Sequence, residues 1–163
     1  MTDISTGNWF RNAIRLLGLR NEVLQIAALP CRVRNGELQV CLITSRRTRR
    51  WIIPKGWPEP DLSHSDTAKL EAWEEAGLEG KVVPETFASY KATKDLEDGL
   101  EMPIRMDVYL MIEPEQKKRF PEVGQRKVKW LCIDKASERI SDEGLRRLLI
   151  QLKAQGLPVA TST

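Results

Sequence analysis

The chain has 163 residues, which suits one domain with a core of its own. Hydrophobic residues make up 41% and charged residues 30%, as in an ordinary soluble globular protein. The net charge of +3, from 26 basic and 23 acidic side chains, is too small to indicate nucleic-acid binding. There is no signal-peptide pattern at the N-terminus, and no apolar run approaches the ~18 residues of a membrane span. We therefore expect no membrane partner and a cytoplasmic location.

Three cysteines lie far apart, and none forms a CxxC pair. Cys31 and Cys41 fall inside long apolar runs, and Cys132 lies near the end of a shorter strand-like segment. An odd number of widely separated cysteines favours small buried hydrophobic side chains over a disulfide framework. This agrees with a reducing compartment.

The N-terminal segment 1–20 places Trp9, Phe10, Ile14 and Leu17 among basic residues. This spacing predicts a short amphipathic helical extension that ends near Gly18. Such a helix can pack on the domain, pair with a second subunit or touch a membrane surface. Its short length favours the first two, so a homodimer is a possible assembly.

The middle of the chain is rich in strand patterns. Asn35-Gly36 lies between two apolar runs, and this pair is the strongest short-range signal for a β-hairpin. We expect strands at 24–34, 38–46, 51–54, 82–92, 105–112 and 128–133, with a charged loop at 95–102.

Two segments have a helical pattern. Residues 66–76 end at Gly77, a common C-terminal stop, and residues 141–155 place four leucines on one face, with Ser141 as the expected N-cap. Strands mixed with two main helices predict an α/β fold, a helix-sheet-helix sandwich with a mixed sheet. We assign the domain to 21–156 and a flexible tail to 157–163.

Three glutamates gather on the first of these helices. With about 100° of turn per residue, Glu71, Glu74 and Glu75 fall within an arc of about 100°, and we expect that arc to face away from the core. A solvated acidic face is one interpretation. The other is a cleft in which the carboxylates repel one another and bind a hard divalent cation.

The surroundings of the acidic helix favour the cation site. The stretch 56–78 resembles the Nudix box, G-x5-E-x7-R-E-U-x-E-E-x-G-U, in which U is a bulky aliphatic residue. The small residue Ala72 occupies the first U position. The matching positions are Gly56, Glu71, Glu74, Glu75, Gly77 and Leu78.

The resemblance implies the chemistry of this site. In the Nudix family the helix glutamates bind Mg²⁺ or Mn²⁺, which bridge a diphosphate and help to activate a water molecule. Glu71, Glu74 and Glu75 are then metal ligands, with Glu71 or Glu75 as the catalytic base. The Gly56 carbonyl and Glu122, from a late loop, are further candidate ligands.

Two positions depart from the box. Leu62 stands where the family has Glu, and Leu70 where it has Arg. In the family these side chains usually pair and hold the loop against the helix. We expect Leu62 to pack on Leu70 in their place, because replacing a buried ion pair with apolar residues is often neutral or stabilising by about 1–4 kcal/mol. A weak or inactive site is the alternative.

A basic segment precedes the box, with four arginines in residues 46–50 and a lysine at 55. Guanidinium groups match phosphate oxygens, although a solvated loop would have the same composition. Residues 24–152 resemble the Nudix branch that cleaves diphosphoinositol polyphosphates and diadenosine polyphosphates, through Ser45-Arg46, 51–56, 120–122 and Trp130. This implies a small-molecule polyphosphate substrate and four phosphate-binding candidates: Arg46, Lys55, Arg126 and Lys127.

Three functions remain open at this point. The first is a metal-dependent hydrolase of a nucleoside or inositol diphosphate linkage, and the second is a non-catalytic module that binds a nucleotide or a protein. The third, an RNA pyrophosphatase, rests on the basic segment alone. Nucleic acid is not the expected partner, because the sequence has no helix-turn-helix pattern. The single histidine, His64, excludes a zinc site built from two histidines, and we expect it at the surface.

Overall fold

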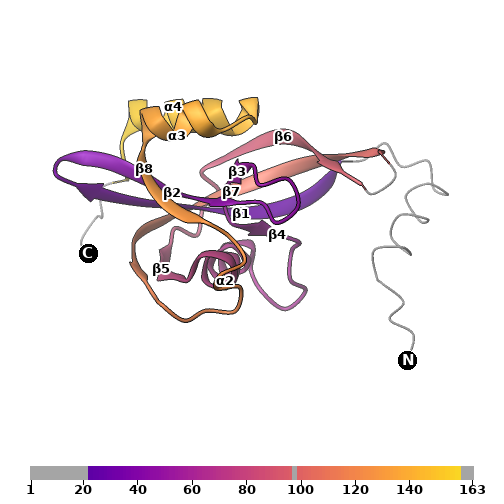
Figure 1. Ribbon diagram of the computed structural model, residues 1–163, viewed down its shortest axis with the longest axis horizontal. Helices are drawn as coiled ribbons and strands as arrows, with labels where there is room; N and C mark the ends of the chain where they lie inside the picture. Colours follow the sequence, from indigo (N-terminus) through magenta and orange to yellow (C-terminus); the bar gives the residue numbers. More distant parts are fainter. Residues whose placement is uncertain (1–21, 97–98, 159–163) are drawn as a thin grey trace.

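The computed structural model describes residues 22–96 and 99–158. Figure 1 shows a central β-sheet with helices on both faces. The N-terminal extension expected at 1–20 lies outside the described residues, and so does the tail from 159 onward. Leu157, at the expected start of that tail, packs against the core.

The residues that the structure describes form one sheet of eight strands. Strand β1 (Val23–Arg34) runs parallel to β7 (Glu101–Gln116), from the pair Val23–Ile104 to the pair Cys31–Ile112. The other strand pairs of the described residues are antiparallel, so the predicted mixed sheet is confirmed. The remaining strands are β2 (Glu37–Thr44), β3 (Trp51–Ile52), β4 (Lys55–Gly56), β5 (Leu78–Val82), β6 (Ala88–Asp95) and β8 (Val128–Cys132).

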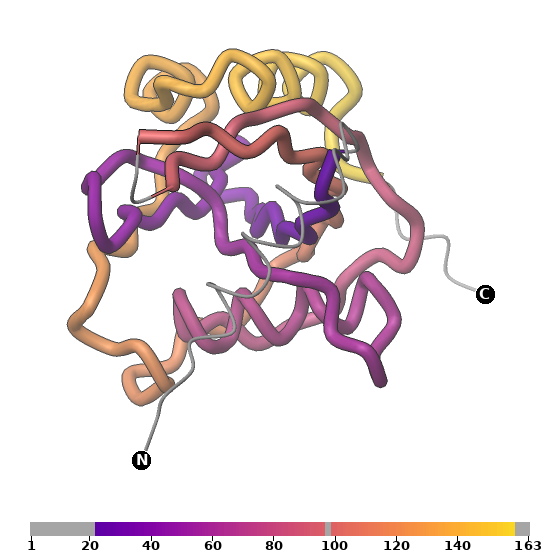
Figure 2. The backbone as a smooth tube through the Cα atoms, turned by 90° about the vertical axis from the view of Figure 1, so that its right-hand side faces the viewer, coloured from indigo at the N-terminus to yellow at the C-terminus, as the bar shows by residue number. Residues whose placement is uncertain are grey.

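Three helices cover this sheet in the described part of the chain. Helix α2 (His64–Ala76) lies on one face, and α3 (Ile133–Arg139) and α4 (Glu143–Gln155) lie on the other. Figure 2 shows the same three layers after a quarter turn. The predicted helix-sheet-helix sandwich is therefore confirmed. None of these helices, within the residues described, is both long and apolar enough to cross a membrane.

Alternate residues of the central strands build two cores. In β1, Ile26 and Ala28 face α2, whereas Ala27 and Leu29 face α3 and α4. Besides Thr67 and Glu75, the residues that α2 buries on its side of the sheet are the alanines Ala68, Ala72 and Ala76. These small side chains bring α2 close to the sheet.

The hairpin prediction is confirmed. Asn35 has φ 53° and Gly36 has φ 74°, the two positive values that a two-residue type I′ turn requires. Cys31 and Cys41 are buried, as expected, and Cys132 is partly buried.

Several expected boundaries were wrong. The single strand expected at 82–92 is divided into β5 and β6, since Pro84 lies between them and has no N–H for a sheet ladder. Strand β7 extends through Pro103 and Pro114, which shortens the expected loop at 95–102. Helix α3 was not expected, because seven residues offer too little periodicity.

The helix starts also differ from the prediction. Helix α2 begins at His64 rather than 66, with Ser63 as N-cap. Helix α4 is capped by Asp142, whose carboxylate accepts a 3.0 Å hydrogen bond from the Leu145 N–H, and not by Ser141. Aspartate accepts from a helix N-terminus at least as well as serine does, so both positions matched the capping rule.

Candidate metal and phosphate site

The site begins where β4 meets α2. Strand β4 pairs with β1 through Ile26–Gly56 and Ala27–Lys55, which holds the end of β4 beside the helix. A Cβ placed on Gly56 would overlap the carboxylate of Glu71. Glycine at position 56 is therefore a packing requirement, and it puts the backbone of residue 56 directly against an acidic side chain.

Glu75 lies on the buried side of α2. It is only 7% exposed, so our expectation that all three glutamates face away from the core was wrong for this residue. Glu71 and Glu74 are partly exposed. Trp73 is also partly exposed. The buried side of the helix is formed by Ala68, Ala72 and Ala76, and Glu75 lies on that same side.

Two positively polarised groups hold the buried carboxylate. Oε2 of Glu75 accepts a 3.2 Å hydrogen bond from the Lys55 N–H, and Oε1 lies 3.0 Å from Nη2 of Arg126. Burial raises the pKa of Glu75 above its usual value, and the charges of Arg126 and Lys55 oppose that rise.

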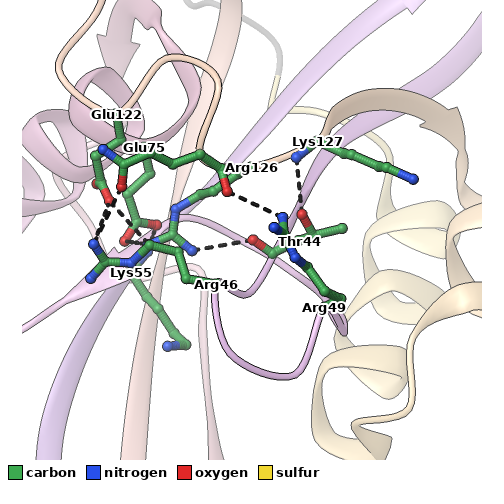
Figure 3. Close-up of polar contacts among 9 residues, drawn as sticks. Thr44, Arg46, Arg49, Lys55, Glu75, Glu122, Arg126 and Lys127 are labelled. Atoms are coloured by element: carbon green, nitrogen blue, oxygen red, sulfur yellow. Dashed lines mark hydrogen bonds and ion pairs between the residues drawn. The ribbon is translucent and has the colours of Figure 1, made fainter.

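Arg126 connects three segments (Figure 3). Besides the bond to Glu75, its Nη2 lies 3.4 Å from Oε1 of Glu122, and its Nη1 donates a 3.2 Å hydrogen bond to the Thr44 carbonyl at the end of β2. The Arg126 side chain is only 7% exposed. Its Nε is buried and has no hydrogen-bond partner.

The loop between β7 and β8 supplies Glu122 and Arg126, and it is fixed to the end of α2. Gly77 ends the helix with φ 68°, and the Phe120 ring covers it so closely that no Cβ would fit. The Glu122 N–H donates a 3.0 Å hydrogen bond to the Glu74 carbonyl. These contacts bring Glu122 to the acidic helix, where the family resemblance had suggested it.

The carboxylates act on one another electrostatically. Burial, followed by the charges of Glu75, Glu74, Glu122 and Glu59, raises the pKa of Glu71 to about 7. Burial, together with the charges of Glu122 and Glu59, also raises the pKa of Glu74. Carboxylates that repel one another are a suitable set of ligands for a hard divalent ion such as Mg²⁺ or Mn²⁺.

The present arrangement is not a finished coordination shell. Among residues 22–96 and 99–158, no three His, Cys, Asp or Glu side chains are arranged to hold a metal ion. Instead, the guanidinium of Arg126 lies within reach of Glu75 and Glu122. The carboxylate oxygens suit a divalent ion chemically. In this structure the guanidinium of Arg126 provides the positive charge beside Glu75 and Glu122.

The predicted phosphate-binding residues are only partly brought together. Arg46 reaches Glu122 and the Gln125 side chain, with both distances 3.4 Å, so it lies at the edge of the acidic group. Lys55 contributes its N–H to Glu75, but Figure 3 shows its side chain pointing away from Glu122. Burial lowers the pKa of the Lys55 ammonium.

Lys127 is not part of the group. Its N–H donates a 2.9 Å hydrogen bond to Thr44 Oγ1, and its side chain points away from Arg126 (Figure 3). Sequence reasoning missed Thr44, which is buried and holds both residues 126 and 127. It also missed Gln125, whose backbone and side-chain oxygens accept from Arg49 and Arg46. In the sequence these two residues look like any other polar residue, because their hydrogen-bond partners are distant in the chain.

The two box departures do not form the buried pair that we expected. Leu62 is 40% exposed, and Leu70 is partly exposed. Neither belongs to the two core clusters of the described residues. His64 is exposed at the first turn of α2, as expected.

Comparison with known proteins agrees with this geometry. The sequence model of the NUDIX domain matches residues 23–152. Nudix hydrolase 4 of Arabidopsis thaliana is 26% identical over 115 residues, which cover 69% of this chain and 52% of that protein. Nudix hydrolase 17, mitochondrial, of the same plant is 30% identical over 117 residues, covering 69% and 60%. The chain thus matches half to two thirds of the length of these curated relatives.

Solved structures share the fold. A C. elegans Ap4A hydrolase superposes with a TM-score of 0.61 at 15% identity, over 83% of this chain and 98% of that chain. The NUDIX domain of Shewanella oneidensis NrtR, complexed with ADP ribose, superposes with a TM-score of 0.64 at 15% identity, over 95% and 99%.

Proposed function

Because the chain belongs to the NUDIX domain family, we propose that it is a metal-dependent hydrolase that cleaves a diphosphate linkage in a nucleoside or inositol polyphosphate. The main support is the packing of Gly56 against Glu71, together with the pKa values of Glu71 and Glu74, which burial and then the charges of neighbouring glutamates raise. Such a concentration of buried negative charge favours a cation.

Five groups would hold the ion: the Gly56 carbonyl and the carboxylates of Glu71, Glu74, Glu75 and Glu122. When bound, Mg²⁺ or Mn²⁺ supplies positive charge to the phosphate oxygens and acidifies water. Glu71 is the better candidate for the catalytic base. Glu75, by contrast, is occupied by the Lys55 N–H and by the guanidinium of Arg126.

Basic residues around the carboxylates would bind the polyphosphate. Arg46 and Arg126 already lie beside Glu122, and the buried Arg126 has an unused Nε–H. Lys55 would reach a phosphate on its own side of β4. We place Lys127 at the periphery, because its side chain points away from Arg126. A dinucleoside polyphosphate and ADP-ribose are test substrates suggested by the similar folds.

A second candidate is a NUDIX-fold module with weak or no activity that binds a nucleotide or a protein partner. The exposed Leu62 favours it, because the loop–helix pair of the Nudix box is not replaced by a buried contact. Arg126 favours it as well, since its guanidinium already neutralises two of the proposed ligands.

A substrate panel separates these functions. The full chain is incubated with diadenosine tetraphosphate, ADP-ribose, a diphosphoinositol polyphosphate and 5′-triphosphorylated RNA, each with Mg²⁺ or Mn²⁺. We expect cleavage of at least one small diphosphate, abolished by EDTA and by Glu74→Gln and retained by Glu79→Gln, a charge-matched change at an exposed position. Tight binding of a nucleotide without cleavage would support the binding module instead.

We also propose a cytoplasmic location, and we propose a homodimer as the assembly to test by sedimentation. The word mitochondrial in the names of some relatives makes cell fractionation the corresponding test for location.

A further inference from the structure

The guanidinium of Arg126 occupies a position between two carboxylates that the proposed function assigns to a divalent ion. Its Nη2 is 3.0 Å from Glu75 Oε1 and 3.4 Å from Glu122 Oε1. Ligand oxygens lie about 2.0–2.6 Å from Mg²⁺ or Ca²⁺. An ion bound to these two oxygens would therefore sit against Nη2, and the two positive charges would repel each other.

Arg126 is held in this position by more than surface charge. The side chain is 7% exposed, and Nη1 donates a 3.2 Å hydrogen bond to the Thr44 carbonyl. A buried carboxylate such as Glu75 needs a counter-charge, so the ion pair stabilises the protein when no metal is bound.

The hydrogen bonds of Arg126 are nevertheless incomplete. Its buried Nε has no partner, although buried polar groups are nearly always hydrogen-bonded. The unpaired Nε–H can donate a hydrogen bond to a ligand oxygen that no residue supplies. This second observation is independent of the acidic cluster and points to a ligand oxygen beside Arg126.

We propose that Arg126 is the resting counter-ion of the metal site, and that it must release Glu75 and Glu122 before a divalent ion can bind them. The inference rests on the proposed function, because it assumes that these carboxylates bind metal. It makes Arg126 a positioning residue that opposes metal binding in the absence of substrate. A substrate phosphate oxygen that binds the guanidinium in place of the two carboxylates would then favour metal binding.

The test is a Mn²⁺ titration of the full chain without substrate. The electron paramagnetic resonance signal of free Mn²⁺ measures how much of the ion remains unbound. Arg126→Gln removes the competing charge and should lower the dissociation constant about tenfold, within the usual range of coupling between sites. Lys129→Gln makes the same charge change at an exposed position on β8, and should leave the constant nearly unchanged. Thermal unfolding gives a second readout. Without metal, R126Q should have a lower melting temperature than wild type, and Mn²⁺ should raise its melting temperature by more.

Arg126→Lys completes the series. Its single ammonium keeps the charge but loses the planar fork, so its Mn²⁺ affinity should lie between those of wild type and R126Q. If R126Q does not fold, R126K decides alone: tighter Mn²⁺ binding than wild type supports the inference, and equal or weaker binding overturns it. An equal gain in R126Q, R126K and K129Q would also overturn it.

The failures of the two proposals are distinguishable. If wild type, R126Q and K129Q all leave Mn²⁺ free, the metal site itself is wrong and the inference falls with it. If wild type binds Mn²⁺ and R126Q binds it no more tightly, only the inference is wrong.

Discussion

The carboxylate of Glu71 occupies the space in which a side chain at position 56 would begin. This single contact joins the end of β4 to the middle of α2, and it brings together two residues that are fifteen positions apart in the chain. The relationship leads directly to a substitution test.

Gly56→Ala should displace Glu71. Overpacking of this kind costs about 1–3 kcal/mol of unfolding free energy, and we expect hydrolysis and Mn²⁺ binding to fall together. Urea unfolding and the Mn²⁺ titration check this expectation. Gly36→Ala is the control, because its φ of 74° makes the substitution strained while no atom lies within 4 Å of the new Cβ. Loss of Mn²⁺ binding in both variants would show that any strained glycine substitution lowers it, and that the contact between residues 56 and 71 is not the cause.

The raised pKa of Glu71 gives a pH dependence with a definite sign. The folded protein holds this proton up to about pH 7, whereas an unperturbed glutamate has a pKa of 4.5. The folded state therefore binds more protons than the unfolded state between these values, and stability decreases as the pH rises through this window. Without metal, Glu71→Gln should raise the melting temperature at pH 8, and the difference should disappear near pH 4.5. A destabilised variant at pH 8 would contradict the electrostatic account of the site.

Glu74 and Glu75 should respond differently to the same change. Both Glu74→Gln and Glu75→Gln are expected to lower turnover by orders of magnitude, since both carboxylates are proposed ligands. Glu74 is partly exposed, so its variant should lose no more than about 0.5 kcal/mol of stability. Glu75→Gln weakens a buried ion pair with Arg126 and should cost about 1–3 kcal/mol. Chemical denaturation measures both, and full turnover in either variant would remove it from the site.

The sequence predicted the parts of this site that depend on local spacing. The interval from Gly56 to Glu71 and the turn at Asn35-Gly36 each depend on residues close together in the chain. Burial of Glu75 was not predictable in this way, because it depends on Arg126, which is 51 residues away. Thr44 was missed for the same reason: its hydrogen bonds to residues 126 and 127 span more than 80 positions.

Fold prediction failed where a local signal was weak or ambiguous. The apolar run at 82–92 was read as one strand, although Pro84 divides it, and the short α3 had no periodic pattern. At Leu62 and Leu70 the identity of the residues suggested packing, but position 62 lies in an exposed loop. Hydrophobic character alone does not establish burial.

The exposed position of Leu62 makes the box departure testable. The double variant Leu62→Glu with Leu70→Arg restores the residue types of the Nudix box. An exposed ion pair contributes about 0–1 kcal/mol, so we expect stability to change by no more than that and turnover to stay near that of the parent. The substrate panel and thermal unfolding provide the measurements. A large gain in turnover would show that the two leucines limit catalysis.

The start of α4 offers a test of the fold that leaves the site untouched. Asp142→Ala removes the carboxylate that accepts from the Leu145 N–H, and a lost N-cap costs about 0.5–2 kcal/mol. Helix α4 places four buried leucines in the core on the side of the sheet opposite α2, so fraying at its first turn should lower the melting temperature. Ser141→Ala is the matched control and should have little effect, because Ser141 is not the cap. If Ser141→Ala lost more stability than Asp142→Ala in urea unfolding, Ser141 would be the N-cap, as expected from the sequence. Mn²⁺ binding should be the same in both variants.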